Sequence, residues 1–468
     1  MNLKALCCCT VVGGTLLSHV CSAQAETIGQ AVEHMLMTNP AIRAAAYNRL
    51  GRDQEVRQAK AGYYPILDVD GGVGYQDIQE PIDDELNPTQ MRVRLRQNLY
   101  RGLATMNEVD RQEARVRSQA YRIQSTAEEV ALRGSEVYLN VLRRTELAAL
   151  AQENLDNHLR ISDQINLRSE SGVASKADSD QVAGRVSLAE SNIVVTKTNL
   201  IDAKSNYLSV VGHMPAELSR PAFQEKMLPE SLEDAENRAL QNHPTLKIAL
   251  ADLDARKEQA EVAKAPFHPI LDVELEQHWD EDFDQEGQDH QFLAMARLRY
   301  NLFNGFSDEA RRVETKHLVN EAREIRNSTY RQVVESIRLS WMAYQAELGR
   351  INYLEKRVAS TKATAKSYVN QFNLGKRTLL DVLDTEAEVI DAKRDLVNAQ
   401  YNSIYNQYRI LAGMGQLVGA FEKQWPEEST VSEEGSARDQ EILLHNDIET
   451  IETFNKGVFE RPMPDSKG

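Results

Sequence analysis

The chain has 468 residues, of which 54 are Lys or Arg and 71 are Asp or Glu, so its formal net charge is −17. Hydrophobic residues make up 41 % and aromatic residues 6 %, which is lean for a compact globular core and too apolar for a disordered chain. The acidic balance argues against a nucleic-acid-binding protein, and the absence of a run of 18 apolar residues argues against a membrane-spanning helix.

Residues 1–25 predict a secretory signal peptide. Lys4 supplies a positive charge, residues 5–17 are apolar, and Ala23-Gln24-Ala25 is a small-x-small cleavage site. All four cysteines precede that site, so a mature chain that begins at Glu26 has no thiol and forms no disulfide. The alternative is a buried first helix.

The remainder of the chain predicts two copies of one structural unit. Residues 64–69 match residues 268–273 at an offset of 204, and residues 94–102 match residues 297–305 at an offset of 203. Because repeats define units of structure, we expect four segments after the signal peptide. They are a first repeat (26–212), a mid-height equatorial segment (213–243), a second repeat (244–415) and an acidic C-terminal tail (416–468).

Each repeat contains two segments in which apolar and polar residues alternate: about 66–78 and 90–100 in the first, about 270–280 and 291–303 in the second. A period of two over about ten residues is typical of a half-buried strand or a transmembrane β-strand. The acidic face of one strand can meet the basic face of the next as cross-strand pairs.

Most of each repeat predicts a long helical hairpin, over residues 103–212 and 305–415. Apolar and small residues follow a 3-4 spacing there, which favours coiled-coil packing, although an ordinary amphipathic bundle fits the same pattern. The proline-free stretch 103–168 would be about 100 Å long as one helix, at about 1.5 Å per residue. We therefore expect a helical rod with four strands at one end and two hairpin tips at the other.

Four strands are too few to close a barrel, and an open strand edge is not viable in lipid. Two copies would supply about eight strands and three copies about twelve, and only the larger barrel leaves an aqueous lumen. The fold class expected is thus an α+β membrane protein, a trimeric 12-stranded β-barrel continuous with an α-helical barrel. Outward aromatic residues fit an interfacial girdle (Tyr75, Trp279, Phe292, Tyr300). The alternative is a soluble four-stranded sheet that caps a coiled coil.

A family resemblance rests on residues 372–384, together with Ala392-Lys393 and residues 398–401. The segment 372–384 reads Phe-Asn-Leu-Gly-Lys-Arg-Thr-Leu-Leu-Asp-Val-Leu-Asp. It resembles the TolC family of outer-membrane export ducts, and most closely the branch that serves type I secretion. The resemblance implies a homotrimer in the outer membrane lipid of a Gram-negative bacterium, with the helical barrel in the periplasm. It also implies an inner-membrane ABC transporter and a periplasmic adaptor protein as partners, and neither enzymatic activity nor a cofactor.

The same resemblance suggests functional residues at the hairpin tips. Asp381 and Asp384 match aspartates that form rings at the periplasmic aperture, while Arg377 and Asp178 match a tether of the closed state. A tyrosine of the family's tether falls on Phe372, and a threonine falls on Ala177, so two polar contacts are lost. Asp178 and Asp381 also fit helix-capping boxes, an alternative that is compatible with gating.

The main hypothesis is therefore a passive export duct with an iris-like aperture, for proteins by type I secretion. A multidrug efflux duct of the same family is one alternative, and a soluble periplasmic coiled-coil adaptor or stalk is another. Motifs for phosphate, dinucleotide or zinc binding do not occur in the sequence.

Overall fold

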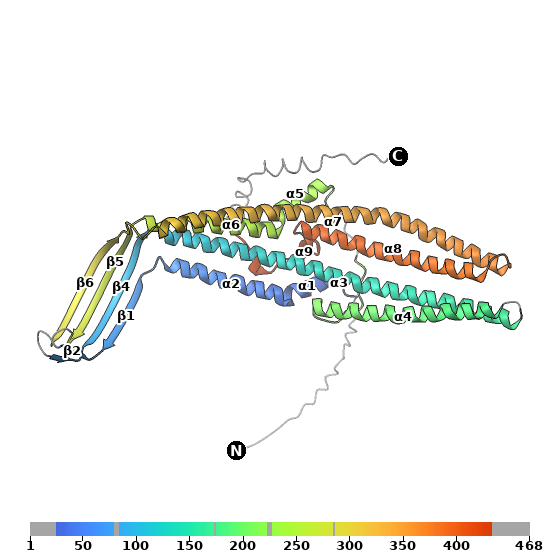
Figure 1. The fold of residues 1–468 in the computed structure, drawn as a ribbon, viewed down its shortest axis with the longest axis horizontal. Coiled ribbons are helices and arrows are strands. Elements are labelled where there is room, and N and C mark those ends of the chain that lie inside the picture. The colour runs from blue at the N-terminus through green and yellow to red at the C-terminus, as the bar shows by residue number, and fades with distance from the viewer. Residues whose placement is uncertain (1–24, 79–83, 173–174, 222–226, 284–285, 433–468) are drawn as a thin grey trace, which may run out of the picture.

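The computed structural model describes residues 25–78, 84–172, 175–221, 227–283 and 286–432. The molecule is elongated, with a four-stranded sheet at one end and two helical hairpin tips at the other (Figure 1). The predicted signal peptide lies outside the described residues, apart from Ala25, and so do residues 433–468 of the predicted tail.

The sheet is antiparallel throughout, with the strand order β1-β4-β5-β6. Its strands are β1 (Ile66–Val73), β4 (Thr89–Arg101), β5 (Ile270–Glu281) and β6 (Gln288–Arg299). The first strand is shorter than the expected 66–78, because residues beyond Val73 leave the sheet. There β2 (Gln76–Ile78) pairs with β3 (Asp84–Leu86) as a separate ribbon. Among the described residues, no strand pairs with the outer edge of β1 or with the outer edge of β6.

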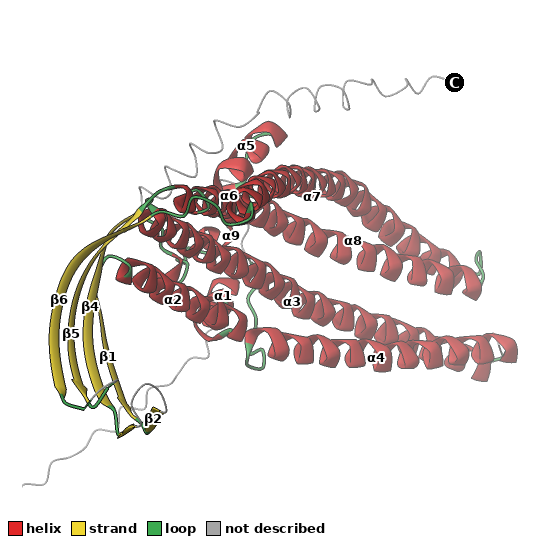
Figure 2. Ribbon diagram, turned by 60° about the vertical axis from the view of Figure 1, so that its left-hand side comes forward, coloured by secondary structure: helices red, strands yellow, loops and turns green. Residues whose placement is uncertain are grey.

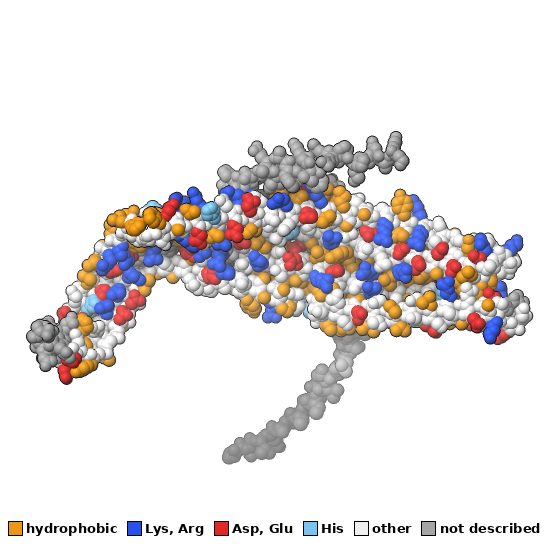
Figure 3. Space-filling model, in the orientation of Figure 1, with side chains coloured by type: hydrophobic (Ala, Val, Ile, Leu, Met, Phe, Trp, Pro, Cys, Tyr) orange, Lys and Arg blue, Asp and Glu red, His pale blue; other side chains and the backbone are white. Residues whose placement is uncertain are grey.

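Charged side chains occupy one face of the sheet, as the alternation predicted. Arg94 Nε donates to Glu276 Oε2 over 2.9 Å, and Arg297 Nε donates to Glu274 Oε2 over 2.9 Å. Figure 3 shows basic and acidic side chains close together at the strand end of the molecule. The opposite face carries apolar side chains that are exposed in the single chain (Leu67, Val69, Val73, Met91, Leu275, Trp279, Phe292, Leu298).

Two long helical hairpins extend away from the sheet. The first is α3 (Ala104–Glu170) with α4 (Lys176–Val211), and the second is α7 (Ser307–Asn373) with α8 (Leu379–Gly413). α3 and α7 each have 67 residues, which is about 100 Å at about 1.5 Å per residue. Among the described residues, no helix combines the length and the apolar character that crossing a membrane requires.

Shorter helices complete the half of the rod nearer the sheet: α2 (Pro40–Ala61) and α6 (Pro244–Val262). In that half α3 packs on α2 and α6, and α6 packs on α7; in the far half α3 packs on α4 and α8, and α8 packs on α7. The chain is thus a curved slab in which α7 forms one long edge, while α2 and α4 form the other (Figures 1 and 2).

The main apolar core lies at mid-height, where α1 (Ile28–Thr38) packs against α3, close to α5 (Leu232–Asn242). α1 fits closely because Gly134 has no side chain: an added Cβ there would lie 1.9 Å from Met35 Cε. The fully buried Tyr138 and Tyr207 belong to the same core.

The segment after α8 packs on this core through residues between Leu417 and Trp425, within the stretch that the sequence assigned to a tail from residue 416. Leu417 and Val418 of α9 (Leu417–Ala420) are buried. Their N–H groups donate to the Glu128 carboxylate, at 2.9 and 3.3 Å, and Trp425 Nε1 donates to it at 3.0 Å. Burial outweighs these hydrogen bonds and raises the pKa of Glu128 to about 7.

Candidate gate at the helical hairpin tips

The two hairpins end in tips of the same construction. Gly172 and Gly375 have φ angles of 71° and 69°, a left-handed conformation that glycine adopts without steric cost. Each return helix then begins with a capping box. Ser175 Oγ donates to Asp178 Oδ2 over 2.8 Å, and the Asp178 N–H donates back to Ser175 Oγ over 3.2 Å.

The second tip repeats this arrangement with Thr378 and Asp381, at 2.8 and 3.3 Å. The capping role that the sequence offered for Asp178 and Asp381 is therefore confirmed. Hydrogen bonds from the Thr378 hydroxyl and N–H lower the pKa of Asp381, so this carboxylate is ionised in the protomer.

Arg377 lies against its own hairpin. Its Nε donates to Gln371 Oε1 over 3.0 Å, its guanidinium carbon lies 4.1 Å from the centre of the Tyr368 ring, and its Nη1 lies 3.8 Å from Asp381 Oδ2. Within the part of the chain that the structure describes, neither these contacts nor those of Asp178 join the two residues. The Arg377–Asp178 tether thus stays a prediction for the assembled protein.

Two other arginines hold the hairpins together, and sequence reasoning missed both. Arg185 Nη2 on α4 donates to Asp384 Oδ1 on α8 over 2.7 Å, with the side chains 33 % and 54 % exposed. Arg168 Nη2 on α3 donates to Asn373 Oδ1 over 2.9 Å, and its guanidinium carbon lies 4.7 Å from the centre of the Phe372 ring. Phe372, which has no hydroxyl, thus takes part in a cation–π contact between the two hairpins.

An apolar cluster supports these polar contacts. It joins both hairpins just above the tips, and Phe372 packs on it (Ile161, Ile165, Val182, Leu379, Val382, Leu383). Farther from the tips, Lys393 of α8 pairs with Glu153 of α3, and Asn157 Nδ2 donates to Glu386 Oε2 over 3.2 Å. The two hairpins of the chain are thus held together by a short apolar seam and a few ionic contacts.

Comparison with known proteins agrees with this architecture. The sequence pattern of the family described as "Outer membrane efflux protein" matches residues 31–213 and 236–416, which together are more than half of the chain. The chain belongs to the outer membrane efflux protein family. The resemblance to the TolC family is thereby confirmed, and the family is one of outer-membrane channels rather than enzymes.

Individual members of the family are distant from this chain in sequence and similar over most of their length. Outer membrane efflux protein BepC of Brucella suis biovar 1 is 20 % identical over 87 % of this chain and 89 % of the relative. Outer membrane protein TolC of Escherichia coli K12 is 22 % identical over 87 % of this chain and 86 % of the relative.

Solved structures support the fold. A structure of CusC has a TM-score of 0.75, at 15 % identity over 83 % of this chain and 91 % of that one. The structure of VceC of Vibrio cholerae has a TM-score of 0.73, at 17 % identity over 83 % of this chain and 96 % of that one.

Proposed function

We propose that the chain is one protomer of a trimeric export duct, in which three four-stranded sheets close a twelve-stranded barrel in the outer membrane. One observation carries this proposal. The sheet has a charged face, an exposed apolar face and two edges that no described strand pairs with, and it stands at the end of helices about 100 Å long. In a closed barrel the apolar face contacts lipid and the charged face lines the lumen, while the helices continue the duct through the periplasm.

The exposed aromatic residues Tyr75, Trp279, Phe292 and Tyr300 support this placement, because aromatic residues favour the two membrane interfaces. The proposal includes an origin by duplication. Both repeats have a 67-residue helix that begins at a left-handed residue, Leu103 or Phe306, and a return helix that begins with a capping box. The signal peptide over residues 1–25 accounts for export of the chain from the cytoplasm.

The hairpin tips are the proposed gate of the duct. Asp381 and Asp384 would form rings of carboxylates around a narrow aperture, which attract cations and repel anions. Arg377 and Asp178 would tether the closed state between hairpins of the assembled trimer. Opening by an outward swing of the second hairpin would also break the Arg185–Asp384 ion pair.

The cargo proposed is protein, delivered by an inner-membrane ABC transporter through a periplasmic adaptor. The run from Gly375 to Asp384 supports this branch of the family. Multidrug efflux is the second candidate, and it is favoured by the similarity to BepC, whose name describes an efflux protein.

Purification of the cross-linked duct from its host tests both candidates. Recovery of an ABC transporter with an adaptor supports protein export, whereas recovery of a drug pump overturns it in favour of efflux. Extraction of the chain by salt alone, as a monomer, would instead indicate the soluble stalk and overturn the duct.

A further inference from the structure

The charged face of the sheet carries more arginines than carboxylates. The register across β4, β5 and β6 places five rows of side chains on this face, from the row of Arg92 and His278 to the row of Arg101 and Arg299. These rows contain six arginines and three carboxylates (Arg92, Arg94, Arg96, Arg101, Arg297, Arg299; Asp272, Glu274, Glu276). This surface, named the basic strip here, is therefore positive although the chain has a net charge of −17.

The three carboxylates of the basic strip lie beneath its arginines. The carboxylate side chains are between 2 % and 11 % exposed, whereas Arg94, Arg297 and Arg299, which pair with them, are 33 %, 42 % and 49 % exposed. Aspartate and glutamate are short and meet their partners close to the sheet, while the longer arginine stems keep the charged groups in water. A molecule that approaches this face therefore meets guanidinium groups before carboxylates.

Two arginines of the strip lack even a buried carboxylate partner. Among the described residues, Arg96 and Arg101 have neither a hydrogen-bond partner nor an ion-pair partner, and Arg101 is exposed. A guanidinium group has five N–H donors in a planar fork, and this fork can hold a carboxylate with two parallel hydrogen bonds. The donors of Arg96 and Arg101 are thus available to an anionic ligand.

A cavity adjoins the end of the strip nearest the helices. It has a volume of about 600 Å³, and Arg101 and Arg299 line it together with Asn301 and Asn304. One carboxylate, that of Asp308, also lines it. The cavity offers room for a small anionic group beside two guanidinium groups and two amide groups.

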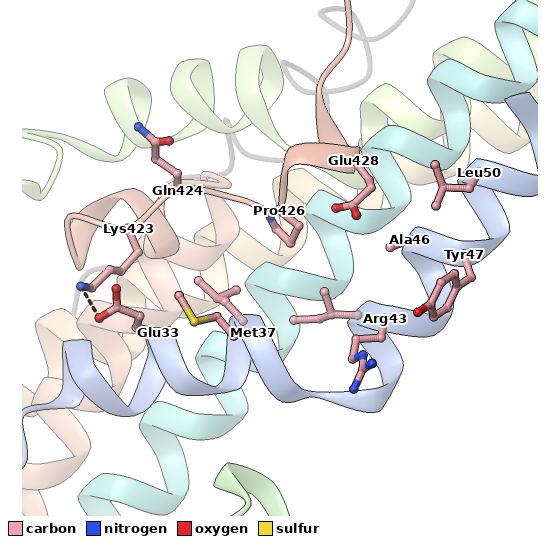
Figure 4. Close-up of a pocket in the computed structure, with 12 residues that line it drawn as sticks. Glu33, Met37, Arg43, Ala46, Tyr47, Leu50, Lys423, Gln424, Pro426 and Glu428 are labelled. Atoms are coloured by element: carbon pink, nitrogen blue, oxygen red, sulfur yellow. Dashed lines mark hydrogen bonds and ion pairs between the residues drawn. The ribbon is translucent and has the colours of Figure 1, made fainter. Parts of the chain in front are cut away.

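A groove elsewhere in the chain shows how this cavity differs from an ordinary charged surface (Figure 4). The groove has a volume of about 560 Å³ and lies between α1, α2 and the segment that follows α9. Arg43 and Lys423 line it, but so do Glu33 and Glu428, and Lys423 Nζ lies 2.7 Å from Glu33 Oε2. Its charges are balanced, whereas those of the basic strip are not.

We propose that the basic strip binds acidic segments of an extended polypeptide as they pass through the barrel. The inference rests on the proposed duct, in which this face lines the lumen, and it adds the chemistry of the cargo. Carboxylates of the ligand bind first to Arg96 and Arg101, because no internal ion pair has to break there.

Spacing supports an extended polypeptide as the ligand. Arg92, Arg94 and Arg96 follow one another along one face of β4, so they repeat at about 6.6–6.8 Å, which is two residues at about 3.3–3.4 Å each. An extended polypeptide presents every second side chain on one side with the same repeat. Acidic residues at alternate positions of the ligand therefore lie opposite successive arginines.

Carboxylates limit the strip on two sides. Asp68 and Asp70 of β1 lie beside β4, and near the turn between β5 and β6 Asp280 lies opposite Asp289. An acidic polypeptide is repelled there, so the contact stays confined and weak enough for the ligand to move on. The aspartates proposed at the tips do not bar such a ligand from an open aperture, because salt screens charges beyond about 8–10 Å.

Block of the single-channel current tests the proposal in full-length protein inserted into planar bilayers. Hexaglutamate, added on the side of the strand turns, should block the current reversibly, and less so at high salt, because salt screens the arginines. Arg96→Gln/Arg101→Gln should weaken the block about 10-fold or more, because hydrogen bonds to charged groups are lost. Arg101→Gln alone should give part of this loss.

Matched variants separate the basic strip from net charge. Arg96→Lys/Arg101→Lys keeps both charges and should retain most of the block. Arg43→Gln/Arg57→Gln removes the same charge from exposed positions on α2 and should leave the block unchanged. Every variant should form the same trimer in detergent, since none of the four arginines has an ion-pair partner among the described residues.

Other outcomes would contradict the proposal. If hexaglutamate does not block the wild-type channel, or blocks Arg96→Gln/Arg101→Gln equally well, the basic strip is overturned as a binding surface and the duct stands. Block by tripolyphosphate without block by hexaglutamate would overturn a polypeptide as the ligand. A protein that forms no channel in bilayers would overturn the duct itself, and the basic strip would fail with it.

Discussion

Docking of the C-terminal segment should depend on pH through Glu128. Glu128 is 4 % exposed and its carboxylate accepts hydrogen bonds from Leu417, Val418 and Trp425, so we expect detachment of this segment to expose the carboxyl to water. When the segment detaches, water returns to the carboxyl and its pKa falls from about 7 towards the ordinary 4.5. The docked state therefore holds its proton more tightly than the detached state.

The sign and size of the effect follow from this difference. A carboxyl with a raised pKa in the docked state stabilises docking fully below pH 4.5, and the contribution disappears as the pH rises to about 7. The difference between the two pKa values bounds the change at about 3.5 kcal/mol, at about 1.4 kcal/mol per pH unit. Hydrogen-exchange protection of the Leu417 and Val418 amides, corrected for intrinsic rates, should therefore fall by up to about 300-fold over this range.

Variants separate this carboxyl from general effects of pH. Glu128→Gln should give hydrogen-exchange protection that does not change with pH. It should weaken docking of the segment by about 1–3 kcal/mol at every pH, because the glutamine NH2 group would face a backbone N–H donor. Glu129→Gln, which changes an exposed neighbour on the same helix, should leave the wild-type profile unchanged. Protection that does not change with pH in the wild-type protein would refute the reasoning.

Three further predictions concern the gate and the core. Arg185→Ala should raise single-channel conductance modestly, because an exposed ion pair with Asp384 contributes at most about 1 kcal/mol per protomer; unchanged conductance would show that the pair does not restrain the tip. Asp381→Ala/Asp384→Ala should abolish cation selectivity and block by divalent cations in planar bilayers, and full retention of both would place the ring elsewhere. Gly134→Ala should lower the free energy of unfolding by about 1–3 kcal/mol, because its methyl group would meet Met35. Met35→Ala in the same chain should recover part of this loss in thermal unfolding, and a neutral Gly134→Ala would contradict the packing argument.

Local patterns in the sequence predicted the secondary structure and its order along the chain. The alternation of Arg94, Glu276 and their neighbours predicted paired strands, because side chains on one face of a strand recur every two residues. The capping boxes at Asp178 and Asp381 could also be predicted from the sequence, since donor and acceptor lie three residues apart. Contacts of this kind are encoded within a few residues.

Contacts between distant segments could be found only in the tertiary structure. Arg185 is 199 residues from Asp384, and Glu128 is 289 residues from Leu417. No local pattern marks either partner, because an exposed arginine or a helical glutamate occurs at many positions in a charged helix. The sequence by itself predicted the main elements and the family, because both depend on local patterns and short motifs. Folding decided which charges bridge the hairpins and that Leu417 and Val418 belong to the core, because helix packing sets those distances.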